Sequence, residues 1–224
     1  MVNPQIRGLL RSLTRMLNLV TLHGMTLTGK LRGSYAKTSL RRREIVMAGL
    51  EVFATSGYRS GSLREIAERV GMSQAGLLHH FSNKSELLAA VLEARDDDAR
   101  MRVPLDSAGI ELIRGLVELV RYNASIPGLV ELHCVLSAEA TDPEHPAHQY
   151  FIARYQWSIG ISTEAFADMK ERGQLVDGVD PASAARSLVA LMDGLQVQWL
   201  LDRTSVVMVD EVHAYVARLL SVPL

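Results

Sequence analysis

One short segment of the chain carries side chains that could read the edges of DNA bases. Gln74 has an amide that can pair bidentately with adenine, and the methyl group of Ala75 can touch the methyl of thymine. Helical spacing places both residues, together with His79, on the face opposite Leu77, where they point to solvent. Glycine destabilises a helix interior by about 1 kcal/mol relative to alanine, so Gly76 marks either tight packing on the first helix of this unit or close approach to a base or phosphate. The spacing favours neither explanation.

Short helices with clear end signals position this segment. A first amphipathic helix is predicted from Ser39, and Gly57 lies where a left-handed residue would end it. The second helix begins at Ser62, because Ser62 and Glu65 have the spacing of a capping box, in which each side chain bonds the backbone amide of the other residue. Apolar residues every three or four positions then give this helix one buried face.

A tight turn joins the second helix to the segment that carries Gln74. Gly71 ends the second helix, and Ser73 is a good N-cap only two residues later. The third helix is predicted to cover residues 74–80, and Asn83 caps a longer fourth helix. Two short helices joined by such a turn form the helix-turn-helix arrangement of DNA-binding proteins.

Basic residues are concentrated at the N-terminal end of the chain. Residues 1–43 contain nine lysines and arginines and no acidic residue, whereas the whole chain has 24 basic and 25 acidic side chains. This asymmetry indicates a polyanionic partner for the basic end. Within residues 1–38 a flexible, solvated arm is the alternative interpretation. If the arm does meet DNA, we expect it to follow the phosphates or enter the minor groove.

The composition favours a cytoplasmic protein without a membrane partner. Cys134 is the single cysteine, so no intrachain disulfide can form, which fits a reducing compartment. No apolar run reaches the roughly 18 residues that a membrane helix needs. The stretch 16–27 is too polar for an export signal, and Met16 or Met25 are alternative translation starts.

The rest of the chain has the periodicity of further helices and almost no strand signals. A fifth helix is expected around Ile110, and a sixth begins at Pro127. A long seventh helix is expected over residues 147–172. Asp180 followed by Pro181 is a strong start signal for an eighth helix, and a ninth helix follows it. The predicted fold class is therefore all-α.

Five motifs in the N-terminal part resemble the DNA-binding domain of the TetR (tetracycline-repressor) family of regulators, and they span about 60 residues without a gap. They are Gly57-Tyr58, Ser62-Leu63-Arg64-Glu65-Ile66-Ala67, Val70-Gly71-Met72-Ser73, Leu77-Leu78-His79-His80-Phe81 and Asn83-Lys84-Ser85-Glu86-Leu87. The charge distribution sets apart a basic arm (1–38), and the resemblance implies a helix-turn-helix domain (39–101) and a helical effector-binding and dimerisation domain (102–224). In the last of these the chain resembles the family only in its helix layout.

The resemblance also assigns DNA contacts residue by residue. It implies that Gln74, Ala75, Gly76 and His79 lie against base edges in the major groove. Leu78 departs from the family, which usually has a tyrosine there, so one phosphate contact is in doubt, and His79 or His80 is expected to replace it only in part. The remaining residues implied at the DNA backbone are Arg42, Arg43, Ser62, Arg64, Ser73, His80 and Lys84.

Two further sites are expected in the C-terminal half. The eighth helix is apolar on more than one face, which indicates a second burial partner. The resemblance implies a homodimer with a four-helix interface there, and the predicted residues lie on the eighth and ninth helices. The predicted interface residues are Leu188, Leu191, Met192, Gly194, Leu195, Trp199, Val212, Val216 and Leu219. Aromatic and polar side chains on helices five to eight suggest a pocket for a small-molecule effector. They are Tyr122, His133, Tyr150, Phe151, Tyr155, Trp157 and Trp199.

Metal binding and catalysis are not expected. Glu144, His145 and His148 offer a histidine pair and a carboxylate, but solvated histidines are more common than zinc ligands at such a helix start. The chain has no phosphate loop, nucleophile elbow or HExxH motif. We therefore expect no cofactor and no enzymatic activity. The predicted function is a repressor that binds a palindromic operator as a dimer and is released by an effector. The alternative is a helical DNA-binding or adaptor protein without an effector.

Overall fold

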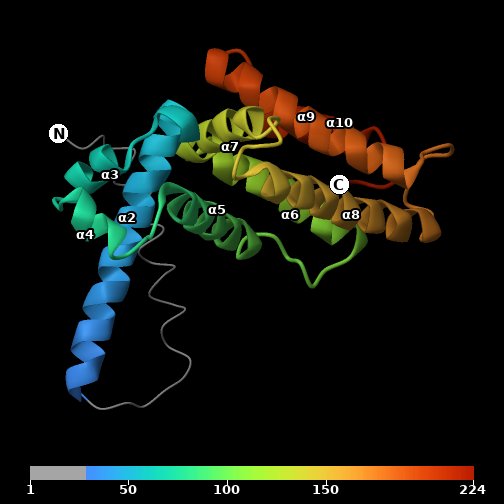
Figure 1. Ribbon diagram of the computed structural model, residues 1–224. Coiled ribbons are helices and arrows are strands. Elements are labelled where there is room, and N and C mark those ends of the chain that lie inside the picture. Colours follow the sequence, from blue (N-terminus) through green and yellow to red (C-terminus); the bar gives the residue numbers. More distant parts are fainter. Residues whose placement is uncertain (1–28) are drawn as a thin grey trace. The chain divides into compact units, whose positions relative to one another are not determined.

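The computed structural model describes residues 29–224, with side chains from residue 37 onward, and this part of the chain is helical (Figure 1). The described residues contain a single isolated β-bridge, between Leu175 and Leu220, and no strand. The chain divides into two compact units that meet between Asp98 and Ala99. This division lies three residues before the boundary that the sequence predicts. The all-α fold is confirmed.

The N-terminal unit is built from α2 (Gly29–Ser60), α3 (Leu63–Arg69), α4 (Gln74–Leu78) and most of α5 (Lys84–Arg100). The predicted start of the first helix at Ser39 is wrong, because α2 begins ten residues earlier. Residues 29–38 are therefore helix and not a flexible arm. An established helix adds one hydrogen bond for each further residue, so it can extend without an apolar stripe. The rest of the predicted arm, residues 1–28, lies outside the described residues.

The core of the N-terminal unit forms where α2 meets the shorter helices. An added Cβ at Gly49 of α2 would lie 3.1 Å from Val91 Cγ2 of α5, so glycine allows these two helices to approach closely. Gly57 has φ 70° and ψ 178°, which interrupts α2 as predicted but outside the left-handed helical well. The largest fully buried side chains of this unit are Ile45, Phe53, Ile66, Leu77, Phe81, Leu87 and Leu88.

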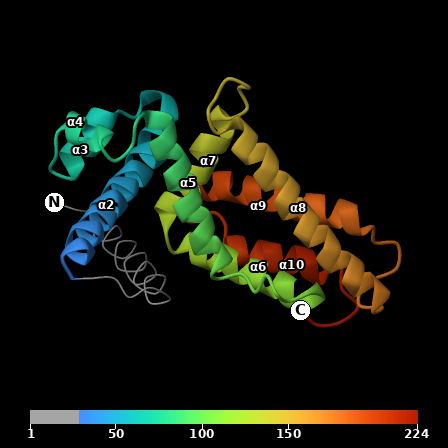
Figure 2. The ribbon, with the colours of Figure 1, turned by 60° about the horizontal axis from the view of Figure 1, so that its bottom comes forward.

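The C-terminal unit contains the five helices that the sequence predicts, and Figure 2 shows them from below. They are α6 (Gly109–Ala124), α7 (Pro127–Glu139), α8 (His148–Glu171), α9 (Pro181–Leu201) and α10 (Met208–Ala217). Asp180 caps α9 as predicted, since its Oδ2 accepts a 2.8 Å bond from the backbone N–H of Ser183. Within residues 29–224 no helix has the length and apolar character needed to cross a membrane.

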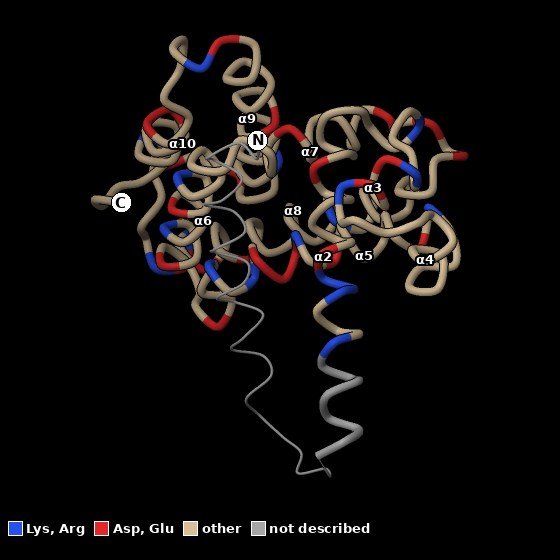
Figure 3. Tube along the Cα trace, turned by 90° about the vertical axis from the view of Figure 1, so that its left-hand side faces the viewer, with Lys and Arg blue, Asp and Glu red and all other residues tan. Residues whose placement is uncertain are grey.

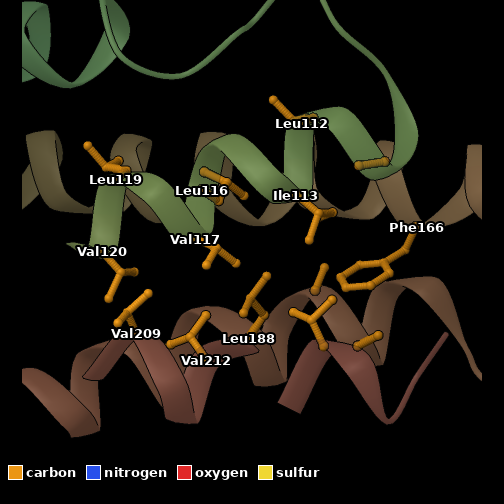
Figure 4. Packing of buried hydrophobic residues seen from close by; sticks show 14 of the residues in the cluster. Leu112, Ile113, Leu116, Val117, Leu119, Val120, Phe166, Leu188, Val209 and Val212 are labelled. Atoms are coloured by element: carbon orange, nitrogen blue, oxygen red, sulfur yellow. The ribbon is translucent and has the colours of Figure 1, made fainter. Parts of the chain in front are cut away.

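The core of the C-terminal unit lies between α6 on one side and α9 and α10 on the other (Figure 4). Ile113 and Val117 of α6 point toward Leu188 of α9 and Val212 of α10, and the ring of Phe166 from α8 fills one end. With Val130 of α7, all five helices of the unit contribute to one continuous cluster, which stabilises the unit in proportion to the apolar area removed from water.

The predicted dimer interface needs correction at five positions. Their side chains are buried in the core of their own unit and leave at most 9 % of their surface for a contact with another subunit. Helix α9 is apolar on two faces because it packs against α7, α8 and α10 of the same chain. Leu191, Met192 and Leu219 are half-buried against this core, and only Gly194 of the predicted set is exposed. The five core residues are Leu188, Leu195, Trp199, Val212 and Val216.

Candidate nucleic-acid and effector sites

The short helix α4 presents the side chains expected to read DNA. Ser73 caps it, because its Oγ accepts a 3.0 Å bond from the backbone N–H of Gly76. Leu77 is fully buried and holds the helix to the unit from behind. Gln74, Ala75 and His79 are exposed, as their spacing predicts. The helix therefore offers an amide, a methyl group and an imidazole on one solvent-facing side.

Gly76 has no packing reason to be glycine. An added Cβ would have Ser73 Oγ as its nearest neighbour at 3.4 Å and Met72 next at 3.9 Å, which are ordinary contact distances within the turn. The explanation by tight packing on the first helix is therefore wrong. Close approach to a base edge or phosphate stays a prediction.

Leu78 is an exposed apolar side chain beside the DNA-reading residues. Its exposed fraction is 39 %. It stands where the resemblance implies a tyrosine, and a leucine cannot donate a hydrogen bond to a phosphate. Leu78 can make only apolar contacts, such as one with a thymine methyl. His80, the next candidate for that phosphate, is half-buried.

The helix ends around α4 are formed by local hydrogen bonds. Ser62 Oγ accepts a 3.0 Å bond from the amide of Glu65, which is half of the predicted capping box. The Glu65 carboxylate accepts from Arg69 Nη2 at 2.9 Å, in place of the expected bond to the Ser62 amide. Asn83 Oδ1 accepts from the amide of Glu86 at 2.8 Å and caps α5 as predicted. The Ser62 hydroxyl keeps its own proton for a further acceptor, such as a phosphate oxygen.

Two of the basic residues implied at the DNA backbone contact both a carbonyl oxygen and an aromatic ring of the unit. Arg42 donates to the carbonyl oxygen of His80, and its guanidinium carbon lies 3.9 Å from the centroid of the Phe81 ring. Lys84 Nζ donates to the Arg59 carbonyl at 3.2 Å and lies 4.5 Å from the centre of the Tyr58 ring. Both cations stabilise the helix-turn-helix framework, and this role is not visible in the sequence.

The other basic candidates lie on the surface of the N-terminal unit. Arg64 is exposed and forms a 2.9 Å ion pair with Glu68, one turn along α3. An exposed pair of this kind is weak and can be exchanged for a phosphate. Arg43 is half-buried on α2, next to Arg42. Figure 3 shows basic positions recurring near the start of the described side chains of α2.

An acidic residue that the sequence reading missed joins three helices of the C-terminal unit. Asp193 of α9 accepts a 2.7 Å hydrogen bond from the Tyr155 hydroxyl of α8, and its other oxygen lies 3.1 Å from His133 Nε2 of α7. The His133 ring packs on Phe151 with centroids 5.7 Å apart, and Phe151 packs on Tyr150 at 5.1 Å. The sequence did offer one sign of this site: Asp193 lies inside the apolar stretch 188–201, and an aspartate is seldom buried unless it has a bonding partner.

The environment keeps Asp193 charged and Tyr155 neutral at ordinary pH. Burial raises the pKa of the Asp193 carboxyl, but the bond and charge of His133 and the bond from Tyr155 outweigh it and hold this pKa below its usual value. Burial, followed by the bond to Asp193, raises the pKa of the Tyr155 hydroxyl. The hydroxyl therefore remains a donor to the carboxylate.

Only four of the seven predicted effector residues come together. His133, Tyr150, Phe151 and Tyr155 form the aromatic cluster around Asp193. The other three lie apart from it for separate reasons. The Arg102 guanidinium lies 3.3 Å from the centroid of the Tyr122 ring. Trp199 is buried and contacts Arg203. Trp157 is exposed.

A groove of about 610 Å³ opens beside this cluster, within the C-terminal unit. Phe151 and Tyr155 are the predicted effector residues that line it, and Arg186 of α9 is a lining residue that the sequence reading missed. The volume falls in the range of sites for small molecules. Its walls come from α7, α8 and α9, and the other lining residues are Ser137, Ala140, Thr141, His148, Ile152, Gln156, Ile159 and Gly160.

The histidines considered as metal ligands form local bonds. His148 Nδ1 lies 2.8 Å from the Ala140 carbonyl oxygen, and His145 Nδ1 accepts a 3.2 Å bond from the Ala147 amide. In the part of the chain that the structure describes, no three His, Cys, Asp or Glu side chains are grouped so that they could hold a metal ion.

Removing the Asp193 carboxylate is expected to loosen the contact between α7, α8 and α9. We expect Asp193→Ala to lower the free energy of unfolding by about 1–2 kcal/mol at pH 7, because His133 and Tyr155 lose a charged partner. A carboxyl whose pKa is lowered on folding stabilises the protein above its unfolded pKa, and this stabilisation is lost as pH falls through the folded value. The difference between variant and wild type should therefore shrink below about pH 4.

Urea denaturation at pH 7 and pH 3 measures this prediction. Asp177→Ala, which removes an exposed carboxylate in the loop before α9, is the matched control and should change stability little at either pH. A destabilisation by Asp193→Ala that is as large at pH 3 as at pH 7 would show that the carboxylate charge is not the cause.

Two family models match the chain, one in each unit. Residues 45–91 match the model described as bacterial regulatory proteins, tetR family, and residues 148–221 match the C-terminal domain of BetI-type transcriptional repressors. The first match covers the helix-turn-helix and the second covers the helices that carry Tyr155 and Asp193. Together they place both halves of the chain in one family.

Curated relatives with the highest identity match only part of the chain. The transcriptional repressor AcnR of Corynebacterium diphtheriae is 39 % identical over 94 residues, which cover 42 % of this chain and 45 % of AcnR. The transcriptional activator FasR of Mycolicibacterium smegmatis is 40 % identical over 31 % of this chain and 32 % of its own. The alignments thus span less than half of these relatives. The regulator TtgR of Pseudomonas putida is 28 % identical over 78 % of this chain and 87 % of TtgR.

Solved structures share the fold over most of the chain. A transcriptional regulator from Saccharomonospora viridis, solved with choline, has a TM-score of 0.65 and 23 % identity, covering 82 % of this chain and all of that one. NalD, a repressor of a multidrug efflux pump in Pseudomonas aeruginosa, has a TM-score of 0.63 and 23 % identity, covering 83 % of this chain and 98 % of NalD. With both family models and the motifs around α3 and α4, these likenesses lead to one conclusion: the chain belongs to the TetR family of bacterial regulatory proteins.

Proposed function

We propose that this protein is a transcriptional repressor that binds operator DNA and is released by a small-molecule effector. The observation that carries the proposal is α4, where Gln74, Ala75 and His79 face solvent from a helix anchored by buried Leu77. Such a helix can enter the major groove with its N-terminal residues against base edges. No enzymatic step is part of the proposal, and its place of action is the cytoplasm.

Relatives support both halves of this function. AcnR is named a repressor, and SmeT is named the repressor of a multidrug efflux pump of Stenotrophomonas maltophilia. SmeT has also been solved as a triclosan complex, and the Saccharomonospora viridis regulator as a choline complex. FasR, in contrast, is named an activator. Activation of transcription is therefore the result that would contradict the proposed repression. Transcription from a reporter that carries the selected operator distinguishes repression from activation.

Base reading by α4 gives the direct test. We expect Gln74→Ala to weaken binding to the operator by about 1–3 kcal/mol and to leave binding to random DNA unchanged, since a bidentate contact with adenine is lost. Operator sites would be selected from random DNA with purified wild-type protein. The affinities of both proteins would then be measured by fluorescence anisotropy at fixed salt.

The control for this test is Gln149→Ala, which removes the same amide from an exposed position on α8. It should bind operator and random DNA like the wild type. An equal loss on both kinds of DNA for Gln74→Ala would place Gln74 at the phosphates and contradict the base-reading role.

We further propose that the protein acts as a homodimer formed through the exposed face of α9. Ala190, Gly194, Val197 and Leu201 are spaced by three or four residues, so they share one face, and all four are exposed. No atom lies within 4 Å of a Cβ added at Gly194, which leaves room for a second helix. This face replaces the buried residues of the sequence prediction. A two-fold dimer would hold two α4 helices about 34–36 Å apart, the spacing of successive major grooves.

The effector would act by a shift of population. A small molecule bound in the C-terminal unit changes DNA binding only as far as it prefers one arrangement of the dimer over the other. Helix α5 carries the chain from the N-terminal unit to the C-terminal unit, so it is the covalent route for this coupling. An effector should lower operator affinity and raise the thermal stability of the free protein.

A further inference from the structure

The groove between α7, α8 and α9 has an apolar floor and a single permanently charged wall residue. Phe151, Ile152 and Ile159 of α8 supply the apolar surface, and Tyr155 adds an aromatic ring. Arg186 of α9 is the only Asp, Glu, Lys or Arg among the lining residues. The groove thus combines an apolar surface with one positive charge.

The Arg186 guanidinium is exposed in the single subunit, one helical turn before Ala190, where the α9 face proposed for the dimer begins. Its side chain is exposed and, within the described residues, forms no hydrogen bond or ion pair. A guanidinium presents planar N–H donors that match the two oxygens of a carboxylate. An anion in the groove would therefore gain a charged partner without displacing another anion from Arg186.

The Asp193 carboxylate, which lies near the groove, already has hydrogen-bond partners for both of its oxygens. Asp193 is not a lining residue, and both of its oxygens are bonded, one by the Tyr155 hydroxyl at 2.7 Å and the other by His133 at 3.1 Å. A cationic ligand would find an aromatic surface but no carboxylate on the wall, and it would face the Arg186 charge. Charge complementarity thus favours anions.

We propose that this groove binds a small amphiphile with one anionic head, whose head pairs with Arg186 and whose apolar tail lies along Phe151, Ile152 and Ile159. The proposal rests on the proposed function, because it names the chemical class of the effector. The proposed ligand is an anion, whereas the Saccharomonospora viridis regulator was solved with choline, which is a cation. The C-terminal similarity to BetI-type repressors extends over α8 and α9, but it does not determine which charge this groove accepts.

A series of ligands with one tail and three heads tests the ligand class. Octanoate, octanamide and octyltrimethylammonium would be titrated by calorimetry into the full-length protein at pH 7.5, below their micelle concentrations. We expect octanoate to bind at least tenfold more tightly than the other two, since only its head is complementary to the guanidinium. Tighter binding of the trimethylammonium compound, or equal binding of all three, would overturn the proposal.

Variants then test the residue. Arg186→Gln should weaken octanoate binding at least tenfold and leave octanamide binding unchanged, while Arg186→Lys should keep part of the affinity. Arg218→Gln removes an exposed arginine at the end of α10 and is the matched control. Because Arg186 is exposed in the single subunit, its replacement should not disturb folding, and sedimentation velocity checks that Arg186→Gln keeps the oligomeric state of the wild type. Unchanged octanoate binding in Arg186→Gln would exclude this residue as the anion partner.

Operator binding with and without octanoate separates the ligand class from the proposed function. If octanoate binds through Arg186 and weakens operator binding, both proposals are supported. If it binds through Arg186 without any effect on operator DNA, the anion site stands and the effector role fails. If operator DNA is released by the cationic compound instead, the regulator function stands and the ligand class proposed here is wrong.

Discussion

Replacing Phe166 with alanine should lower the free energy of unfolding of the C-terminal unit by about 3–5 kcal/mol, the cost of removing a buried phenylalanine and leaving a cavity. The Phe166 side chain has no exposed surface and lies in the cluster between α6 and α9 (Figure 4). The helices that surround the ring are fixed by their other contacts and cannot collapse fully into the space. The loss is large beside a typical domain stability of 5–15 kcal/mol.

The tryptophans make this change measurable in one unit of the chain. The protein has two, Trp157 and Trp199, and both belong to the C-terminal unit. Urea denaturation followed by tryptophan fluorescence therefore reports on that unit. Trp157→Ala is the control, since it removes a large aromatic side chain from the same helix at a position that is 44 % exposed. A loss of stability in Trp157→Ala equal to that in Phe166→Ala would contradict the assignment of the core.

Replacing Val197 with arginine should convert the proposed dimer into monomers and abolish tight operator binding. Val197 is 49 % exposed on the α9 face that carries Ala190 and Gly194, so an arginine there does not disturb the core of its own subunit. In a two-fold interface the change places two like charges near each other, and an unpaired buried charge costs about 3–5 kcal/mol. Without the second subunit only one α4 can contact a half-site.

Sedimentation velocity and operator binding measure this prediction together. Val207→Arg is the matched control, because it makes the same substitution at a 61 % exposed position in the loop before α10. It should remain dimeric and bind the operator. If Val197→Arg also sediments as a dimer, the subunits meet through another surface. Leu195→Arg would be uninformative, since Leu195 is buried and the variant would unfold.

The sequence predicted most helices well because their ends depend on local chemistry. Ser73, Asn83 and Asp180 cap α4, α5 and α9 through bonds to amides three residues later, and those partners are fixed by spacing alone. The start of α2 was not predictable in this way. Helix extension before Ser39 needs neither a cap nor an apolar stripe, so the composition of residues 29–38 carries no boundary signal.

The sites were harder to predict because they depend on which helices meet. An apolar position such as Val212 is suited to a core or to a dimer interface, and only the packing of α6 and α9 against α10 shows that it belongs to the core. Asp193 was missed for the same reason: its partners Tyr155 and His133 lie 38 and 60 residues away in the chain. Pairings over such distances leave no periodic pattern in a single sequence.

The exposed position of the α4 side chains has a consequence for how this protein can change over generations. Gln74, Ala75 and His79 contribute little to the core, so exchanging them should usually alter stability by less than about 0.5 kcal/mol. Mutations that redirect the protein to a new operator can therefore accumulate without compensating changes elsewhere. A library randomised at these three positions should consist mostly of folded members, from which repressors of unrelated DNA sequences could be selected.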